Sequence, residues 1–395
     1  MSVEKRPNRL EAMGMMALVN PAIKFDSHSR RAMLAHHVDQ APAVAEPDIP
    51  RMLHGFESQL KVFDIRMPTN AKVISVHNKY QKGFDNNSIK ENSCITVIYQ
   101  CQTTGKYDVL DITGYNDRHS IYGSQYILTP EIKKLRPDAF IPKDTVFARN
   151  PTIKEGGIFS NGLSVNIVKL SLPCTIEDGY GISESLCKRG ALLELPVVLG
   201  SWGRKTYPLN LYSDNPLIYK PFPDIGDTIR EDGLVFAFRE YDNIFDALEM
   251  SNESLMEVDM VHDIRVYGTP GAYVYDVTVE SGIGESNFKQ VTSPLMAIQP
   301  NKYIKQYSDY FSSILEIYDQ VILKDRNARL EPKLMNLITR AYADKPNLVK
   351  NTTNIPGIIR RVYKGIPLDE FRVSIYAKKR VPLRMGAKLT GTSGN

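Results

Sequence analysis

Apolar and polar side chains alternate through one late stretch of the chain, Glu370-Phe371-Arg372-Val373-Ser374-Ile375-Tyr376-Ala377. An alternation with a period of two predicts a β-strand that buries one of its two faces. The buried face would be formed by Phe371, Val373, Ile375 and Ala377. Because much of the chain before it has the same character, this strand indicates a β-rich fold.

Other strand signals lie upstream. Residues 73–76 and 94–99 are β-branched runs bounded by polar turns, and residues 161–170 alternate in the same way. The region from 190 to 300 is again strand-rich, with Pro and Gly punctuation. These patterns predict a mixed, mainly β architecture.

One segment differs. Between residues 306 and 343, apolar residues recur at helical spacing in two runs, separated by the turn Lys324-Asp325-Arg326-Asn327. The pattern predicts a helical hairpin appended to a β-rich body. A shorter helical pattern covers residues 30–35.

The composition is that of a soluble globular protein, with 42% hydrophobic and 24% charged residues. A length of 395 residues is enough for two or three domains. No apolar run reaches membrane-spanning length, so we expect an intracellular protein with no membrane partner. The cysteines form no CxxC pair, and we expect reduced, mostly buried thiols at Cys94, Cys101, Cys174 and Cys187.

Positive charge is concentrated near the end of the chain. Residues 359–388 carry nine basic side chains against two acidic ones, a net charge of +7, whereas the whole chain carries +4. Such a segment is typical of phosphate-backbone binding. A solvated strand face is the alternative, and charge alone does not separate the two. The candidate nucleic-acid-binding residues are Lys378, Lys379, Arg380 and Arg384.

Two further features could carry chemistry. The adjacent carboxylates Glu177 and Asp178 stand at a turn, where they could reach Mg²⁺ directly or through water, although most such pairs are solvated turn residues. Lys388 lies in a glycine-rich run, which lets a backbone approach phosphates, although such a run is also typical of a flexible tail.

Three stretches follow, in order, the motifs of one family. Residues 25–35 are similar to His-Asp-Asp-Ala-Asn-Arg-Ala-Leu-Met-Gly, and residues 175–185 resemble Asn-Phe-Glu-Asp-x-apolar-x-apolar-Ser-Glu. Residues 380–395 resemble Arg-Arg-Ile-x-x-Gly-Asp-Lys-x-x-Gly-Arg-His-Gly-Asn-Lys-Gly. The chain therefore resembles the β subunit of multisubunit DNA-directed RNA polymerase, and looks most like the split β subunits of phiKZ-like giant bacteriophages.

This resemblance implies a fold and a domain order. The expected fold is a double-psi β-barrel with an inserted flap or wall domain and a helical hairpin, plus a small α/β fork segment. Residues 1–65 would form the fork-region segment and 66–189 the first part of the barrel. Residues 190–345 would be the insertion, and 346–395 would return to the barrel with the basic strand and the lysine loop.

The resemblance also implies roles. Lys388 falls on the lysine that contacts the growing RNA 3′ end, and Arg30 on the arginine that reaches the triphosphate of the incoming nucleotide. Glu177 and Asp178 would lie near the second Mg²⁺ ion. The basic strand would line the channel of the RNA–DNA hybrid.

The sequence also departs from the family. Ala387 stands where the family has Asp, Thr392 and Ser393 replace Arg-His, and the motif's second lysine would follow Asn395. We therefore expect a split β subunit, with the remainder supplied by a second polypeptide or lying beyond an intron or intein.

The expected partners are largest-subunit polypeptides, remaining β-like fragments, the DNA template, nascent RNA and nucleoside triphosphates. Mg²⁺ would be held mainly by the largest subunit, so this chain would be inactive alone. The expected location is the cytoplasm of an infected bacterial cell or a phage-made compartment within it. The alternative is a non-catalytic structural or nucleic-acid-binding protein derived from a polymerase fragment.

Overall fold

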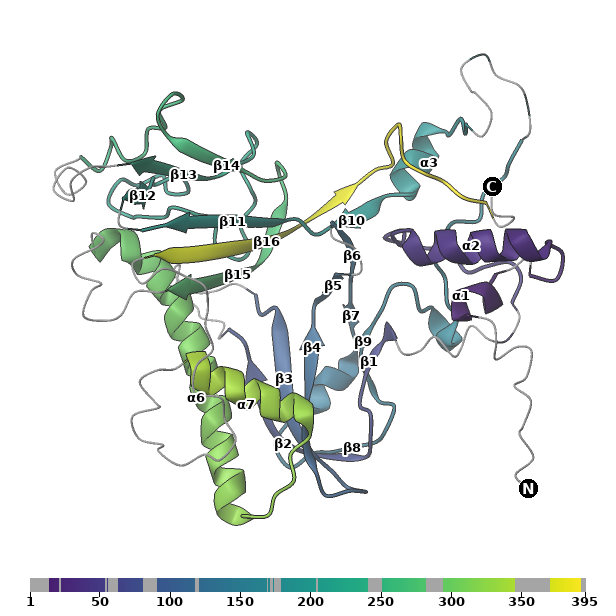
Figure 1. The fold of residues 1–395 in the computed structure, drawn as a ribbon, viewed down its shortest axis with the longest axis horizontal. Coiled ribbons are helices and arrows are strands. Elements are labelled where there is room, and N and C mark those ends of the chain that lie inside the picture. The colour runs from purple at the N-terminus through teal and green to yellow at the C-terminus, as the bar shows by residue number, and fades with distance from the viewer. Residues whose placement is uncertain are drawn as a thin grey trace.

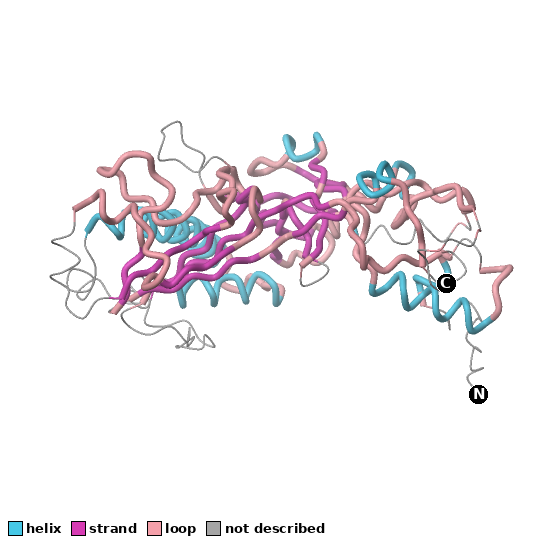
Figure 2. The backbone as a smooth tube through the Cα atoms, turned by 90° about the horizontal axis from the view of Figure 1, so that it is seen from above, coloured by secondary structure: helices cyan, strands magenta, loops and turns pink. Residues whose placement is uncertain are grey.

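The computed structural model describes residues 14–20, 23–53, 55, 63–80, 91–117, 121–168, 170, 173, 179–203, 205–240, 251–281, 294–344 and 370–391. This part of the chain is mixed and mainly β, with a half-barrel sheet and few helices. The molecule is elongated, and strands run along its length between two lobes (Figure 2).

The strand β16 (Phe371–Val381) joins the two lobes (Figure 1). Its first part pairs antiparallel with β11 (Val197–Trp202) on one side and β15 (Tyr273–Ser281) on the other. Its last residues pair with β10 (Leu192–Glu194). The predicted alternation is confirmed, because four side chains on one face are fully buried: Phe371, Val373, Ile375 and Ala377.

The sheet continues from β10 into the second lobe. Strand β10 pairs with β6 (Tyr122–Gln125), which pairs with β5 (Tyr115–Asp117). Gly123 in β6 is required for this close approach, because an added Cβ would lie 2.4 Å from the carbonyl oxygen of Asn116.

An aromatic core fills the first lobe around Trp202, which is 1% exposed. The Trp202 ring lies 5.5 Å from Phe371 and 6.0 Å from Phe238, measured between ring centroids. Phe238 belongs to a second, three-stranded sheet that covers β11. Its strands are β12 (Thr206–Pro208), β13 (Leu234–Glu240) and β14 (Ile264–Tyr267).

A four-stranded antiparallel sheet forms the middle of the molecule, in the order β4-β3-β2-β8. It confirms the strands predicted at 73–76 and 94–99. Its strands are β2 (Ala71–Asn78), β3 (Cys94–Cys101), β4 (Tyr107–Thr113) and β8 (Phe140–Ile141). One face packs against a small sheet of β1 (Ile65–Arg66), β7 (Ile127–Leu128) and β9 (Val146–Arg149).

The predicted helical pair covers the other face of the four-stranded sheet (Figure 1). It consists of α6 (Ile298–Lys324), which begins earlier than the periodicity indicated, and α7 (Pro332–Asp344). Ile98 of β3 packs against Ile314 of α6 in one apolar cluster. His77 of β2 contacts Ser313 of α6, with 2.8 Å between the histidine Nδ1 and the serine Oγ.

The second lobe contains α1 (Met15–Leu18), α2 (His28–Gln40) and α3 (Glu184–Arg189). Short 3₁₀ turns complete the described chain: η2 (Pro130–Lys134), η3 (Glu155–Gly157) and η4 (Pro294–Ala297). None of the described helices combines the length and apolar composition needed to cross a membrane. Among the described cysteines, Cys101 is buried and Cys94 and Cys187 are half-buried, all as thiols; Cys174 lies outside the described residues.

The strand predicted at 161–170 is wrong, because none of its described residues lies in a strand. The Gly162 carbonyl accepts a hydrogen bond from the Asp48 N–H at 2.8 Å, and the Ser164 N–H donates to the Asp48 carboxylate at 2.8 Å. Ile167 and Val168 are 65% and 76% exposed. An alternating pattern is compatible with a strand, but a strand also needs backbone hydrogen bonds to a neighbouring strand.

Candidate functional site

The run that follows β16 is shaped by a glycine turn. The Ala387 N–H donates to the Arg384 carbonyl at 3.1 Å, and Gly386 within this turn has a φ of +88°. A positive φ at this position favours glycine. The turn leaves the side chains of Arg384 and Lys388 exposed.

This run is tied to α3. The Leu383 N–H donates to the Cys187 carbonyl at 3.0 Å, and Gly190 approaches Leu383 so closely that an added Cβ would lie 2.6 Å from Cδ1 of that leucine. Helix α3 begins at an N-cap: the Ser183 hydroxyl accepts from the Leu186 N–H at 3.2 Å. In the sequence, a serine directly before a helical segment, as Ser183 is here, is the signal for such a helix start.

The run is also tied to α2, which carries Arg30. The imidazole Nδ1 of His37 lies 3.3 Å from the hydroxyl of Thr390, two residues after Lys388. Arg30 precedes His37 by seven residues, close to two helical turns, so both project from one face of α2 about 10 Å apart along the axis. Arg30 is exposed, and the Ser27 hydroxyl caps the helix start. The structure therefore brings the helix of Arg30 and the loop of Lys388 together.

Asp48 links the connector after α2 to the same group of elements. Its carboxylate accepts from the Ser164 N–H and pairs with Arg189 at the end of α3. These interactions, the Ser164 hydrogen bond first and Arg189 second, hold the pKa of Asp48 below its usual value. The connector thus holds α3 in place beside the closing run.

The predicted acidic pair cannot be placed, since Glu177 and Asp178 lie outside the described residues. Among the residues that are described, no group of three or more His, Cys, Asp or Glu side chains is arranged to hold a metal ion. Mg²⁺ therefore stays a prediction from the resemblance.

The three basic residues at the end of β16 each contact another part of the chain. The Lys379 ammonium donates to the Pro270 carbonyl at 2.5 Å, and Arg380 pairs with Glu46 at 2.7 Å. The Arg380 side chain is still 48% exposed. These residues stay candidates for nucleic-acid contact, and the described contacts show how their side chains are held.

Lys378 sits in a tyrosine cluster that the sequence did not indicate. Its ammonium lies 2.7 Å from the Tyr115 hydroxyl and 4.8 Å from the centroid of the Tyr273 ring. The Tyr273 hydroxyl donates to Glu91 at 2.7 Å. Burial lowers the pKa of Lys378, and the charge of Glu91 partly offsets this effect. These tyrosines come from separate strands, so no local pattern joins them.

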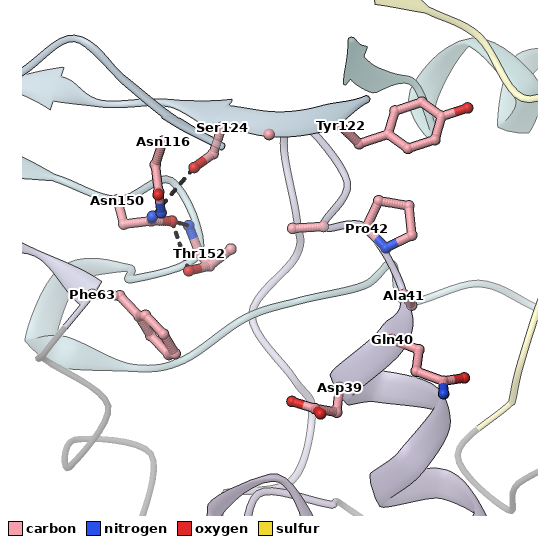
Figure 3. Close-up of a pocket in the computed structure, with 12 residues that line it drawn as sticks. Asp39, Gln40, Ala41, Pro42, Phe63, Asn116, Tyr122, Ser124, Asn150 and Thr152 are labelled. Atoms are coloured by element: carbon pink, nitrogen blue, oxygen red, sulfur yellow. Dashed lines mark hydrogen bonds between the residues drawn. The ribbon is translucent and has the colours of Figure 1, made fainter. Parts of the chain in front are cut away.

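The structure also contains a cavity at the C-terminal end of α2, opposite β5 and β6 (Figure 3). It is lined by residues from separate segments of the chain: 39–43, 63, 116, 122–124, 150 and 152. No single stretch of sequence could have predicted it.

No protein-family model matches the chain, and no curated protein sequence shows significant similarity to it.

Proposed function

We propose that the chain is a β-subunit fragment of a multisubunit DNA-dependent RNA polymerase and acts in nucleotidyl transfer only within an assembly. Its partners would be largest-subunit polypeptides and remaining β-like polypeptides, with DNA template, nascent RNA and nucleoside triphosphates as ligands. The assembly would work in the cytoplasm of an infected bacterium or in a phage-made compartment there. Under this proposal the half-barrel sheet would belong to a double-psi β-barrel carrying a flap-like insertion.

One observation carries the proposal. The contact between His37, two residues after the first motif segment, and Thr390, in the last motif segment, joins residues 353 positions apart in sequence. Arg30 and Lys388 belong to these two segments, and a polymerase needs both cations beside the reacting phosphates. The contact between the segments supports a shared phosphate-binding surface.

The chemistry follows from the residue types. A lysine ammonium is a compact charge that can hold a backbone phosphate of the RNA 3′ end, the role proposed for Lys388. An arginine guanidinium stays charged and forms paired hydrogen bonds with phosphate oxygens, which suits Arg30 to a triphosphate. Glu177 and Asp178 would assist near a second Mg²⁺ ion held mainly by the partner subunit. Lys378, Lys379, Arg380 and Arg384 would face the nucleic acid.

The direct test is Lys388→Ala in the complex purified with its partner subunits. A lost charge-assisted contact is worth about 1.5–3 kcal/mol, so elongation should slow by about 10- to 100-fold, whereas Lys388→Arg should retain more activity. The matched control is Lys133→Ala, an exposed lysine in η2. Unchanged elongation by the Lys388→Ala complex would overturn the assigned role.

A non-catalytic nucleic-acid-binding or structural protein is the second candidate. It is favoured by Ala387, which stands where the family motif has an acid. Purification of the native complex separates the two. A copurifying subunit with an Asp-x-Asp-x-Asp motif supports the polymerase, and its absence from an otherwise intact complex supports the alternative.

A further inference from the structure

The cavity beside the C-terminal end of α2 has a volume of about 410 Å³ and is built from described residues on several elements (Figure 3). This volume falls within the range of small-molecule sites in proteins. It lies about 15 Å along α2 from Arg30, because ten residues separate Arg30 from Gln40. The cavity is therefore separate from Arg30, whereas the run of Lys388 contacts α2 at His37, one turn before Gln40.

Two aromatic side chains stand on different sides of this cavity. Figure 3 shows Phe63 on one side of the cavity and Tyr122, at the start of β6, on another, with the Tyr122 ring directed away from Phe63. The Phe63 ring is held by Phe159, with 6.0 Å between ring centroids. A fixed aromatic ring favours a flat, unsaturated ligand that can stack.

The polar wall near Phe63 is pre-organised. Asn150 and Thr152 are 4% and 3% exposed, and the Thr152 hydroxyl donates to the Asn150 carboxamide oxygen at 2.8 Å. The Asn150 carboxamide nitrogen lies 3.3 Å from the Ser124 hydroxyl (Figure 3). Its backbone N–H donates to the buried Asp64 at 2.9 Å. These groups are held by one another, so this wall of the cavity keeps its shape.

One further side chain can read the edge of a ligand, because Asn116 lines the cavity from β5. Gln40 also lines the cavity, and its carboxamide nitrogen lies 2.9 Å from Nε2 of His36, one turn earlier in α2. A carboxamide offers a donor and an acceptor side by side, which matches the edge of a nucleobase.

The electrostatics oppose a phosphate. Among the described residues that line the cavity, Asp39 is the charged one, and none is Lys, Arg or His. The C-terminal end of a helix carries a partial negative charge, and α2 ends here. A carboxylate accepts hydrogen bonds, so the cavity favours a ligand with an exposed amino group.

We propose that this cavity binds a nucleobase that carries an exocyclic amino group, with any attached phosphate held outside it. The base could arrive as a free nucleoside or as an unpaired base of a nucleic-acid strand. This site does not depend on the polymerase function proposed above.

The test is calorimetric titration of the full chain with adenosine, cytidine, uridine, adenosine monophosphate and a short oligoadenylate. Adenosine and cytidine should bind saturably, and uridine should bind about tenfold more weakly. Adenosine monophosphate should also bind more weakly than adenosine, because its phosphate, held outside the cavity, is repelled at longer range by Asp39 and by the negative end of α2. Binding of the oligoadenylate without binding of adenosine would identify the strand as the source of the base, provided that Tyr122→Ala abolishes it.

Three variants sharpen the test. Tyr122→Ala should weaken adenosine binding about tenfold or more, as expected for a lost stacking contact. Asp39→Asn, at an exposed position, should reduce the difference in affinity between adenosine and adenosine monophosphate. Asp309→Asn, at an exposed position in α6, should leave this difference unchanged. Lys133→Ala, at an exposed position in η2 outside the cavity, should leave base binding unchanged.

Other results would overturn the proposal. Equal binding of uridine and adenosine would exclude recognition of the amino group. Competition by glucose would indicate a carbohydrate site instead. Binding that is unaffected by both Tyr122→Ala and Asp39→Asn, in variants whose circular dichroism matches the parent chain, would place the ligand elsewhere.

Discussion

Replacement of Asp263 by alanine is expected to lower the free energy of unfolding by about 3–5 kcal/mol. The Asp263 side chain is fully buried, and its two oxygens pair with Nε and Nη2 of Arg239, each at 2.8 Å. Asp263, through these hydrogen bonds first, raises the pKa of Arg239, so the guanidinium stays charged and would be left without its main partner. Asp263 also accepts the Asp259 N–H at 2.6 Å, which closes the loop before β14.

The measurement can be local because Trp202 is the chain's single tryptophan. Its ring stacks on Phe238, the residue before Arg239, so tryptophan fluorescence during urea unfolding reports on this lobe. The control is Glu184→Ala, which removes a solvent-exposed pair with Lys188 and should cost less than about 1 kcal/mol. The double variant Arg239→Met with Asp263→Leu should recover much of the lost free energy of unfolding, because it leaves no unpaired charge. Equal decreases in the free energy of unfolding for Asp263→Ala and Glu184→Ala would contradict a special contribution of the buried Asp263–Arg239 pair.

The second large effect is a loss of stability in mild acid that depends on His77. This histidine lies between β2 and α6, where its Nε2 is 2.8 Å from the Ser75 hydroxyl and its Nδ1 is 2.8 Å from that of Ser313. Burial lowers the pKa of His77 from 6.5 to about 4. Well above pH 6.5 the imidazole is neutral in both the folded and the unfolded chain, so it contributes no pH dependence there.

As the pH falls from 6.5 to about 4, the unfolded chain gains a proton at His77 that the folded chain resists. Stability is therefore lost across this window and levels off below it, by about 3 kcal/mol in total. The measurement is the free energy of unfolding at several pH values for the parent chain and for His77→Gln. Over this pH window the free energy of unfolding of His77→Gln should fall by about 3 kcal/mol less than that of the parent chain. His262→Gln, at an exposed site, should show the same pH dependence as the parent. Parallel curves for the parent and His77→Gln would refute the role of burial at His77.

Much of the secondary structure could be predicted from local patterns. The alternation in β16 indicated the buried face, and the helical spacing after residue 306 indicated α6 and α7. These predictions succeed because side-chain direction repeats every two residues in a strand and every 3.6 in a helix. The same reasoning failed at 161–170, where the backbone of an alternating segment forms hydrogen bonds with Asp48 and not with a neighbouring strand.

The candidate site was predictable only in part. The motifs indicated Arg30 and Lys388, and the structure brings their segments together through His37 and Thr390. Neither the tyrosine cluster at Lys378 nor the cavity at the end of α2 has a signal in the sequence. The tyrosine cluster is assembled from residues on separate strands, and the cavity from residues on a helix, strands and loops, so both depend on the pairing of distant segments.

The sequence by itself determined that the chain is mainly β, which face of β16 is buried, and where the helical pair and its turn fall. Each of these depends on the chemistry of neighbouring residues alone. The tertiary structure decided which segments meet: β16 between β11 and β15, α2 against the closing run, and several separate segments around one cavity. Such meetings depend on long-range pairing and packing, whose free energy is shared among residues far apart in the chain.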